Sequence, residues 1–417
     1  MKMHRSHPGS SMAVATERNL RATFISLGAC VLACMGLLSA CATTRDSRVA
    51  VANVSFSDYQ RETLRVLETE RSFQLADKRS ELLWNAPNEW QPATIAGARP
   101  KRGILLVHGL GDSPWSFHDL APQLAAQGFL VRTVLLPGHG TRPEALLNVT
   151  AEEWQAVVYA QAQTLEEDVD GPVYLGGFST GANLVLSYAY GHPEIAGLVL
   201  FSPGFKSFPF GWITSLVARV RPWMVSPSDS IANQTPVRYM NVPTNGYAQF
   251  YRTSALAQRL LNRPYEKPVF MVVAQHDSVI NTDYLLRVFQ SSFTNPRSRL
   301  IWYGEKPEGL IDTRRILVRP DRIPELQISQ FSHMGLLFSA SNALYGSHGS
   351  LRICLNSLSK LNTQACERGE PLWYSDWGYS EAGKYHARLT YNPYFDWQNS
   401  IMAGVITWHG ASSQNMD

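Results

Sequence analysis

The chain has 417 residues, of which 45% are hydrophobic and 17% are charged, which indicates a globular protein and excludes a largely disordered one. Its formal net charge of +3 gives no electrostatic reason to expect a nucleic-acid partner. The length is sufficient for one large α/β domain with insertions.

Residues 1–40 are predicted to form a lipoprotein signal peptide. Basic residues precede an apolar run at 24–38, which is short for a membrane span and typical of a secretory signal. The Leu-Ser-Ala-Cys sequence that ends at Cys41 resembles the lipobox of bacterial lipoproteins, in which the cysteine is lipidated. The resemblance implies a lipid anchor on Cys41 in the bacterial cell envelope, and Ala42 favours the outer membrane. The alternative is an ordinary signal peptide with a chance cysteine.

Residues 41–98 are predicted to form a tether and an N-terminal helix. Apolar residues recur at helical spacing among charged residues at 56–73, which predicts a surface helix. The stretch 84–100 is rich in proline and glycine and is predicted to be a loop. It leads into the main domain, residues 99–417.

Strands and helices alternate along the main domain. A continuous apolar run at 103–107 has a length that suits a parallel strand buried on both faces. Further strands are predicted at 129–135, 173–175, 197–201 and 269–274. Helices are predicted at 117–127, at 154–167, directly after residue 181, and at 394–408. This alternation predicts an α/β fold with a mainly parallel central sheet flanked by helices.

The pattern G-x-S-x-G at 177–181 carries the strongest chemical signal. An apolar strand precedes it and a helix follows, as a nucleophile elbow requires. A serine on such a sharp turn has strained backbone, and the residues two positions to either side must be small. Ser179 is therefore the predicted nucleophile. The alternative is a serine that only caps the following helix.

Three short motifs give the chain a resemblance to the α/β-hydrolases, in particular to monoglyceride lipases and small bacterial carboxylesterases. They are His-Gly-Leu-Gly at 108–111, Leu-Pro-Gly-His-Gly at 136–140 and the elbow at 177–181. The resemblance covers roughly residues 100–202 and 268–340. It implies the α/β-hydrolase fold with an inserted cap at about 203–267. It also implies that residues 99–417 are a catalytic domain.

A nucleophilic serine needs a histidine to accept its proton and a carboxylate to orient that histidine. Asp277 follows the strand at 269–274, so it is predicted to lie at the same sheet edge as Ser179, with Asp283 as the alternative acid. Six histidines follow Ser179, namely His192, His276, His333, His348, His386 and His409. By resemblance His333 is the catalytic base, with His348 as the alternative. An apolar run at 334–338 predicts that a helix starts at His333.

The negative charge that forms on the substrate's carbonyl oxygen needs fixed hydrogen-bond donors. One donor is expected to be the backbone N–H of Thr180, directly after the nucleophile. The family resemblance implies that the other is the N–H of Leu110. His108 and His139 are predicted to brace their turns.

Two of the five cysteines, Cys354 and Cys366, lie beyond the N-terminal segment. In an oxidising compartment they are predicted to form a disulfide that closes a short loop, the alternative being two free buried thiols. Their spacing matches no metal site, and no metal-binding or dinucleotide motif is present, so no metal and no cofactor are expected.

The main hypothesis is a lipid-anchored serine hydrolase that cleaves small-molecule or lipid carboxylic esters. A peptidase or thioesterase would use the same triad. The third hypothesis, from a different class, is a non-catalytic surface binding lipoprotein. Aromatic residues in the cap suggest an apolar acyl pocket or the cap's own core, and the aromatic stretch at 370–397 would line the substrate's entrance, contact the membrane or cover the sheet edge.

Overall fold

The computed structural model describes residues 54–93, 98–207, 211–227 and 233–407. The predicted signal peptide and Cys41 lie outside these ranges. None of the helices in the described ranges combines the length and the apolar character that crossing a membrane requires.

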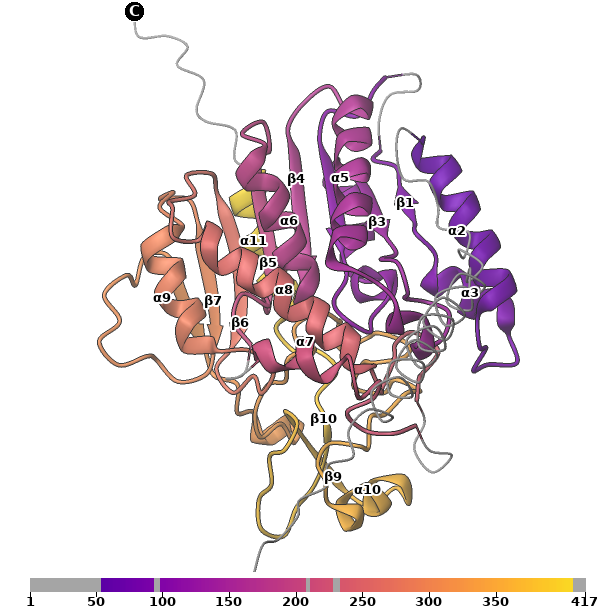
Figure 1. Ribbon diagram of the computed structural model, residues 1–417. Coiled ribbons are helices and arrows are strands. Elements are labelled where there is room, and N and C mark those ends of the chain that lie inside the picture. The colour runs from indigo at the N-terminus through magenta and orange to yellow at the C-terminus, as the bar shows by residue number, and fades with distance from the viewer. Residues whose placement is uncertain (1–53, 94–97, 208–210, 228–232, 408–417) are drawn as a thin grey trace, which may run out of the picture. The chain divides into compact units, whose positions relative to one another are not determined.

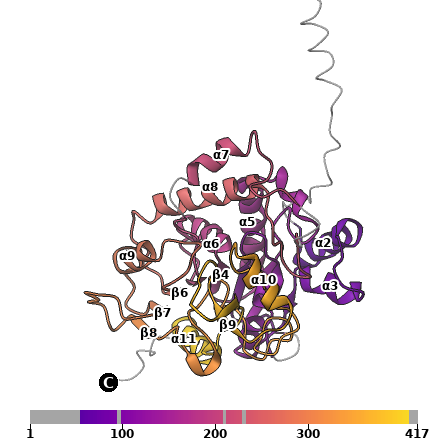
Figure 2. The ribbon, with the colours of Figure 1, turned by 90° about the horizontal axis from the view of Figure 1, so that it is seen from below.

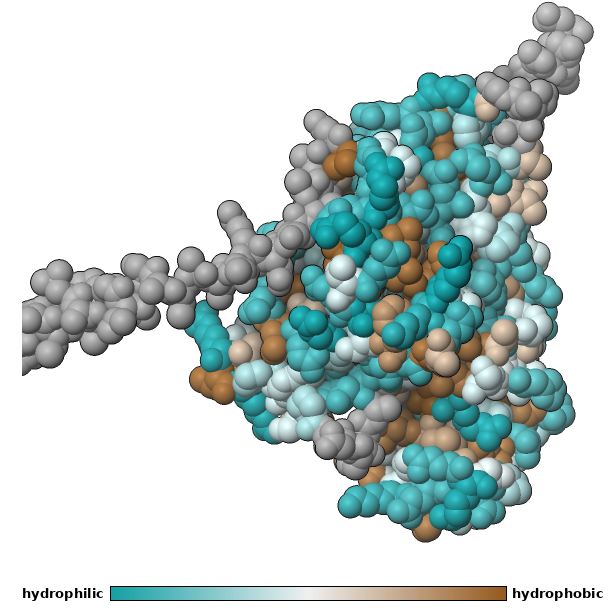
Figure 3. All heavy atoms as spheres, turned by 90° about the vertical axis from the view of Figure 1, so that its right-hand side faces the viewer, coloured by the Kyte–Doolittle hydropathy of each residue, from teal (hydrophilic) through white to brown (hydrophobic). Residues whose placement is uncertain are grey.

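The described chain begins with two helices and a short edge strand. Helix α2 (Phe56–Glu70) starts at Ser55, whose side chain accepts a hydrogen bond from the Asp58 N–H, and it confirms the predicted surface helix. Helix α3 (Lys78–Asn85) and strand β1 (Glu89–Trp90) follow. The prediction of a loop throughout 84–100 was therefore wrong. Strand β1 is held by antiparallel pairing with β3, and a strand of two residues is too short to show a periodic pattern in the sequence. The side that carries α2 and α3 is mainly hydrophilic, with apolar residues in scattered groups (Figure 3).

An eight-stranded sheet forms the centre, in the order β1-β3-β2-β4-β5-β6-β7-β8. Its strands after β1 are β2 (Gly103–Val107), β3 (Leu130–Val134), β4 (Val173–Phe178), β5 (Gly197–Phe201), β6 (Val269–Ala274), β7 (Arg299–Tyr303) and β8 (Ile316–Arg319). All neighbours except β1 and β3 pair in parallel. The mainly parallel sheet and the α/β fold are thus confirmed, and their buried strands explain the continuous apolar runs.

Helices cover both faces of this sheet (Figures 1 and 2). On one face lie α5 (Ala151–Asp168) and α6 (Thr180–Gly191), while α11 (Phe395–Ile406) lies on the other. Helix α4 (Leu120–Ala126) shares the face of α11, because Asn399 donates a 2.9 Å hydrogen bond to Gln123. The remaining short helices of this part are η1 (Pro114–Phe117), η2 (Pro143–Leu147), α9 (Thr282–Ser292) and η4 (Pro324–Leu326).

The segment between β5 and β6 folds as η3 (Gly211–Ile213), α7 (Thr214–Val217) and α8 (Thr244–Leu260). The segment is tied to α6, because Asn183 donates hydrogen bonds of 3.0 Å to the Gly204 carbonyl and to the Thr253 hydroxyl. This is the region predicted to be the cap.

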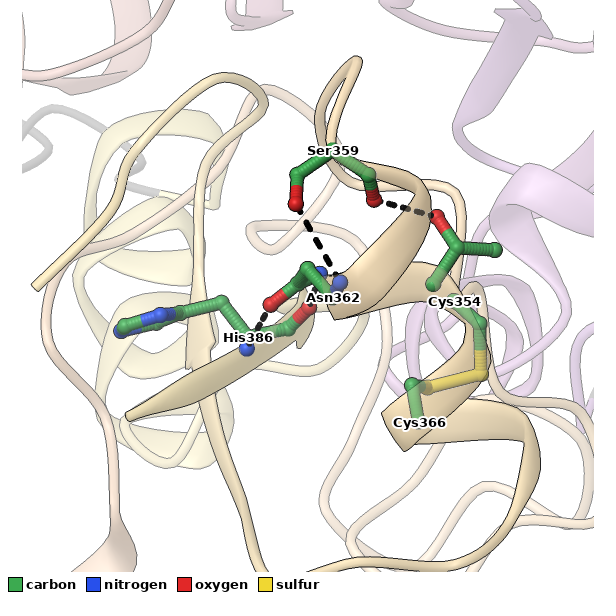
Figure 4. The surroundings of a disulfide bond; sticks show 6 residues. Cys354, Ser359, Asn362, Cys366 and His386 are labelled. Carbon is green, nitrogen blue, oxygen red and sulfur yellow. Dashed lines mark hydrogen bonds between the residues drawn. A yellow bond between two sulfur atoms is a disulfide. The ribbon is translucent and has the colours of Figure 1, made fainter. Parts of the chain in front are cut away.

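A small disulfide-closed unit, residues 353–388, follows the sheet, and we call it the disulfide module. It contains α10 (Lys360–Glu367) and a two-stranded parallel sheet of β9 (Leu372–Ser375) and β10 (Tyr385–Arg388). Cys354 and Cys366 form the predicted disulfide, which joins the start of the module to α10 (Figure 4). Asn362 on α10 donates to the His386 carbonyl and accepts from the His386 N–H, each at 2.7 Å.

Candidate active site

Ser179 occupies a sharp turn between β4, which ends at Phe178, and α6, which begins at Thr180. Its backbone has φ 52° and ψ −113°, a conformation that non-glycine residues rarely adopt. Three backbone hydrogen bonds of 3.1 Å hold it there. The Ser179 N–H donates to Phe201, and its carbonyl accepts from Ala182 and Gly204. The strained turn is thus fixed from both sides, as a nucleophile elbow requires.

The two glycines of the motif are required by close backbone contacts. A Cβ at Gly177 would lie 2.5 Å from the backbone nitrogen of Ala182, and a Cβ at Gly181 would lie 2.0 Å from the Val107 carbonyl oxygen. Neither backbone atom can move without displacing β2 or α6. The helix can therefore approach the sheet this closely only because both positions lack a side chain.

We expect Gly181→Ala to destabilise the protein by about 3 kcal/mol or more, because the added methyl group collides with fixed backbone. Urea unfolding would measure the loss. Gly191→Ala is the matched control, since a Cβ at this last residue of α6 meets no atom within 4 Å. The control is expected to change the free energy of unfolding by no more than about 1 kcal/mol. Equal stability of the two variants would contradict the collision between a Cβ at position 181 and the backbone of β2.

The structure brings His333 and Asp277 together. His333 Nδ1 lies 2.6 Å from Asp277 Oδ2, and both residues are buried. The other carboxylate oxygen of Asp277 accepts from the N–H groups of Val279 at 2.9 Å and Ile280 at 3.3 Å. The carboxylate is therefore held by its own loop while it contacts the imidazole, which fixes the direction in which the ring points.

The same imidazole lies beside the elbow. Its ring centroid is 4.9 Å from that of Phe178, the residue before Ser179. In the described part of the chain Ser179 and His333 share no hydrogen bond, a looseness that is common in triads without bound substrate. His333 begins no helix, contrary to the prediction. The apolar residues after it are buried in an irregular segment of the main core, and a uniform apolar run carries no helical period.

The alternative acid and base lie on the surface. Asp283 is an exposed residue in the first turn of α9, and His348 is exposed as well. The other described histidines after Ser179 have different partners. His192 stacks on Tyr188 and contacts Glu194, and His386 contacts Ser329. His409 lies outside the described residues.

The backbone N–H groups of Leu110 and Thr180 form no hydrogen bond to any described residue. The loop that carries Leu110 is held by neutral histidines. His139 Nε2 accepts from the Gly111 N–H at 3.0 Å, and His108 Nε2 accepts from the Leu136 N–H at 3.1 Å. Burial lowers the pKa of His139 to about 4 and that of His108 well below its usual value. Each ring can therefore act as an acceptor at neutral pH.

His276, next to Asp277, has a separate carboxylate partner. Its Nδ1 lies 2.6 Å from Asp321 Oδ2, and this hydrogen bond raises the pKa of His276 above its usual value. A raised pKa stabilises the folded protein below about pH 6.5, and the contribution is lost as the pH rises through the folded-state value. Sequence reasoning did not pair these residues, which are separated by 45 positions.

We expect His276→Asn to lower the free energy of unfolding more at about pH 5.5 than at about pH 8.5. The His276 side chain is 41% exposed, so solvent screening should keep the difference at about 1 kcal/mol or less. Urea denaturation of both proteins at the two pH values measures it. An equal loss at both values would show that the charge on His276 contributes nothing.

One further carboxylate reaches the site from the disulfide module. Asp376, directly after β9, is buried and lies beside the loop of Asp277. The sequence offered no motif for it. Within the described ranges, here or elsewhere, no cluster of three or more His, Cys, Asp or Glu side chains has an arrangement that would hold a metal ion.

The parallel sheet and the strained serine turn define an α/β-hydrolase. Residues 98–305 match the hydrolase family described as serine aminopeptidase, S33. The chain belongs to the serine hydrolases of the α/β-hydrolase superfamily.

Individual relatives match about half of the chain. The chain is 28% identical over 219 residues to a thermostable monoacylglycerol lipase of Bacillus sp. strain H-257. The aligned region covers 48% of this chain and 84% of that protein. It is 23% identical over 236 residues to a carboxylesterase of Bacillus subtilis, covering 55% and 94%. A solved structure of a metagenome-derived lipolytic enzyme shares 24% identity, covers 52% of this chain and 86% of that chain, and superposes with a TM-score of 0.45.

Proposed function

We propose that the protein is a serine hydrolase that cleaves carboxylic esters through a covalent acyl-enzyme, with Ser179, His333 and Asp277 as its triad. The hydrogen bond of 2.6 Å between His333 and the buried Asp277, beside the strained turn of Ser179, carries this proposal. Similarity to a monoacylglycerol lipase and a carboxylesterase supports an ester as substrate.

Each residue has a defined task in the proposed reaction. Ser179 Oγ attacks the ester carbonyl while His333 Nε2 accepts its proton, and the same histidine then returns the proton to the departing alcohol. Asp277 keeps the proton of the neutral ring on Nδ1, so that Nε2 is free to accept. The carboxylate also stabilises the imidazolium when it forms.

The oxyanion would be held by the backbone N–H groups of Leu110 and Thr180. Both are free of partners among the described residues, and Thr180 is the first residue of α6, where the helix dipole favours negative charge. Loss of one such donor typically costs about 3 kcal/mol of transition-state stabilisation. The cap at about 203–267 is proposed to supply substrate contacts, since it is bonded to α6 through Asn183.

A peptide or thioester substrate is the second candidate, because acyl transfer is common to all three bonds. The match to a family described as serine aminopeptidase favours the peptide variant. A panel of nitrophenyl esters of increasing acyl length, aminoacyl anilides and acyl-thioesters, assayed with the same preparation, tests the proposal. We expect the esters to give the highest kcat/KM. Preferential cleavage of the anilides would replace the ester assignment, and inactivity on the whole panel together with no fluorophosphonate labelling would favour a binding protein.

We also propose that Cys41 carries a lipid that anchors the protein in the bacterial cell envelope, with the outer membrane as its site. The proposal rests on the Leu-Ser-Ala-Cys sequence after an apolar run. Metabolic labelling with a tagged palmitate in the natural host, compared between the wild-type chain and Cys41→Ser, tests it. Equal labelling of the two would remove the anchor assignment.

A further inference from the structure

We propose that Asp376, from the disulfide module, is a positioning residue for the triad: its carboxylate links the backbone of the Asp277 loop to that of the His333 loop. This inference rests on the proposed hydrolase function. It assigns a catalytic purpose to a part of the chain that lies after residue 305, where the family match ends.

The contacts of Asp376 reach both loops at once. Its Oδ2 accepts a hydrogen bond of 2.5 Å from the N–H of Ser278, which directly follows Asp277. Its Oδ1 accepts a longer one, 3.4 Å, from the N–H of His333 itself. Asp376 is 1% exposed. One buried carboxylate therefore touches the chain beside the acid and beside the base, and it limits movement between them.

The module is built to hold Asp376 in place. Asn356 donates 3.0 Å hydrogen bonds to the Ser375 hydroxyl and to the Asp376 carbonyl. The same Asn356 accepts from Arg388 Nε at 2.6 Å, and the Arg388 N–H closes the module on Ile353 at 3.0 Å. Asn356 lies two residues after Cys354, so the disulfide and α10 (Figure 4) restrain the segment that positions Asp376.

A second link joins the end of the module to the histidine loop. The Ser332 hydroxyl donates to the Leu389 carbonyl at 2.5 Å, and the Leu389 N–H donates to Ser375 at 2.9 Å. Ser332 precedes His333, and Ser375 precedes Asp376. Ser332 and the His333 N–H are thus both connected to the end of β9 (Leu372–Ser375), which fits a scaffold for the base better than a surface appendage.

Several charged groups lie around the base. The acidic ones are Asp277 at the sheet edge, Asp112 on the loop that carries Leu110, and Asp376. The nearby cations are Arg388 on β10 and Arg238 in the cap, whose Nη1 contacts Met334. Among the described residues, Asp277 contacts the ring of His333 and Asp376 contacts its backbone N–H, so the two carboxylates hold different parts of the same residue.

The test compares Asp376→Ala and Asp376→Asn with the wild-type protein. Active-site titration with a fluorophosphonate first gives the concentration of competent enzyme. The values of kcat and KM are then measured on the best nitrophenyl ester. We expect kcat of the alanine variant to fall about 10- to 100-fold with KM within about twofold, because the base and nucleophile lose alignment. Asparagine should retain more activity than alanine, because its amide oxygen can still accept one of the two backbone hydrogen bonds.

Asp119→Asn is the matched control. Asp119 also binds a C-terminal segment, accepting from the Ser339 N–H at 2.8 Å and from the Asn342 side chain at 2.9 Å, without contacting either triad loop. We expect its kcat and KM to stay at wild-type values. An Asp119 variant that lost as much kcat as Asp376→Ala would indicate a general packing effect and overturn the inference.

The outcomes separate the inference from the proposed function. Wild-type values of kcat and KM in Asp376→Ala would overturn the positioning role while leaving the hydrolase intact. The labelling rate of Ser179 provides a readout that needs no ester turnover, and it should fall in parallel with kcat. A wild-type protein that neither turns over a panel substrate nor reacts with the fluorophosphonate would remove the proposed function, and the role of Asp376 with it.

Discussion

Replacing Ser179 with alanine is expected to abolish fluorophosphonate labelling and to lower kcat on the best ester on the order of 10⁶-fold. The methyl group cannot attack the carbonyl, so the acyl-enzyme cannot form. The fold should persist, because alanine can replace serine without new bulk and all three backbone hydrogen bonds at the position remain available. Intact-mass spectrometry after labelling, together with steady-state assays, measures both effects.

Ser202→Ala is the control for this experiment. Ser202 is another fully buried serine with a positive φ, 39°, at the end of the neighbouring strand β5. Its hydroxyl has no hydrogen-bond partner among the described residues, so its removal should leave labelling and turnover near wild-type values. If labelling persisted in Ser179→Ala and vanished in Ser202→Ala, Ser202 would be the nucleophile and our assignment of Ser179 would be wrong.

The parts that sequence reasoning located well are those determined by local chemistry. Strands β5 and β6 match the predicted bounds because a parallel strand buried on both faces must be continuously apolar. The elbow is equally local, since the steric limits that require Gly177 and Gly181 operate over five consecutive residues. Such signals need no knowledge of distant partners.

The parts that were missed depend on distant partners. Strands β7 and β8 each contain a short apolar run, which sequence reasoning did not assign to a strand, and β8 takes its place in the sheet by pairing with β7. Asp376 contacts Ser278 across 98 positions and His333 across 43, and neither contact leaves a spacing that a motif could encode. His333 itself was located by family resemblance, and the segment after it was assigned a helix because buried irregular chain and buried helix share the same apolar composition.

Asp277→Asn is expected to lower kcat about 10⁴-fold while the protein stays folded. The amide can present its N–H₂ group to His333 Nδ1, which would move the ring proton to Nε2 and leave no lone pair to accept the serine proton. Assays should show the loss mainly in kcat, and Asp321→Asn, which alters only the neighbouring His276 pair, should stay within about tenfold of wild type.

The result for Asp277→Asn also tests whether a second carboxylate can substitute for the first. Asp376 lies close enough for its pKa to be raised by burial and by the charge of Asp277, yet both of its oxygens accept from backbone N–H groups. These two contacts hold the carboxylate on the backbone, and no hydrogen bond joins it to the ring of His333 in the described part of the chain, so we expect Asp376 not to take over the Nδ1 hydrogen bond. Adding Asp376→Asn to Asp277→Asn should lower kcat by less than the product of the two single losses, because a base in the wrong tautomer gains little from alignment. If Asp277→Asn kept a near-normal kcat and the double variant with Asp376→Asn lost it, Asp376 would instead be the carboxylate that supports His333.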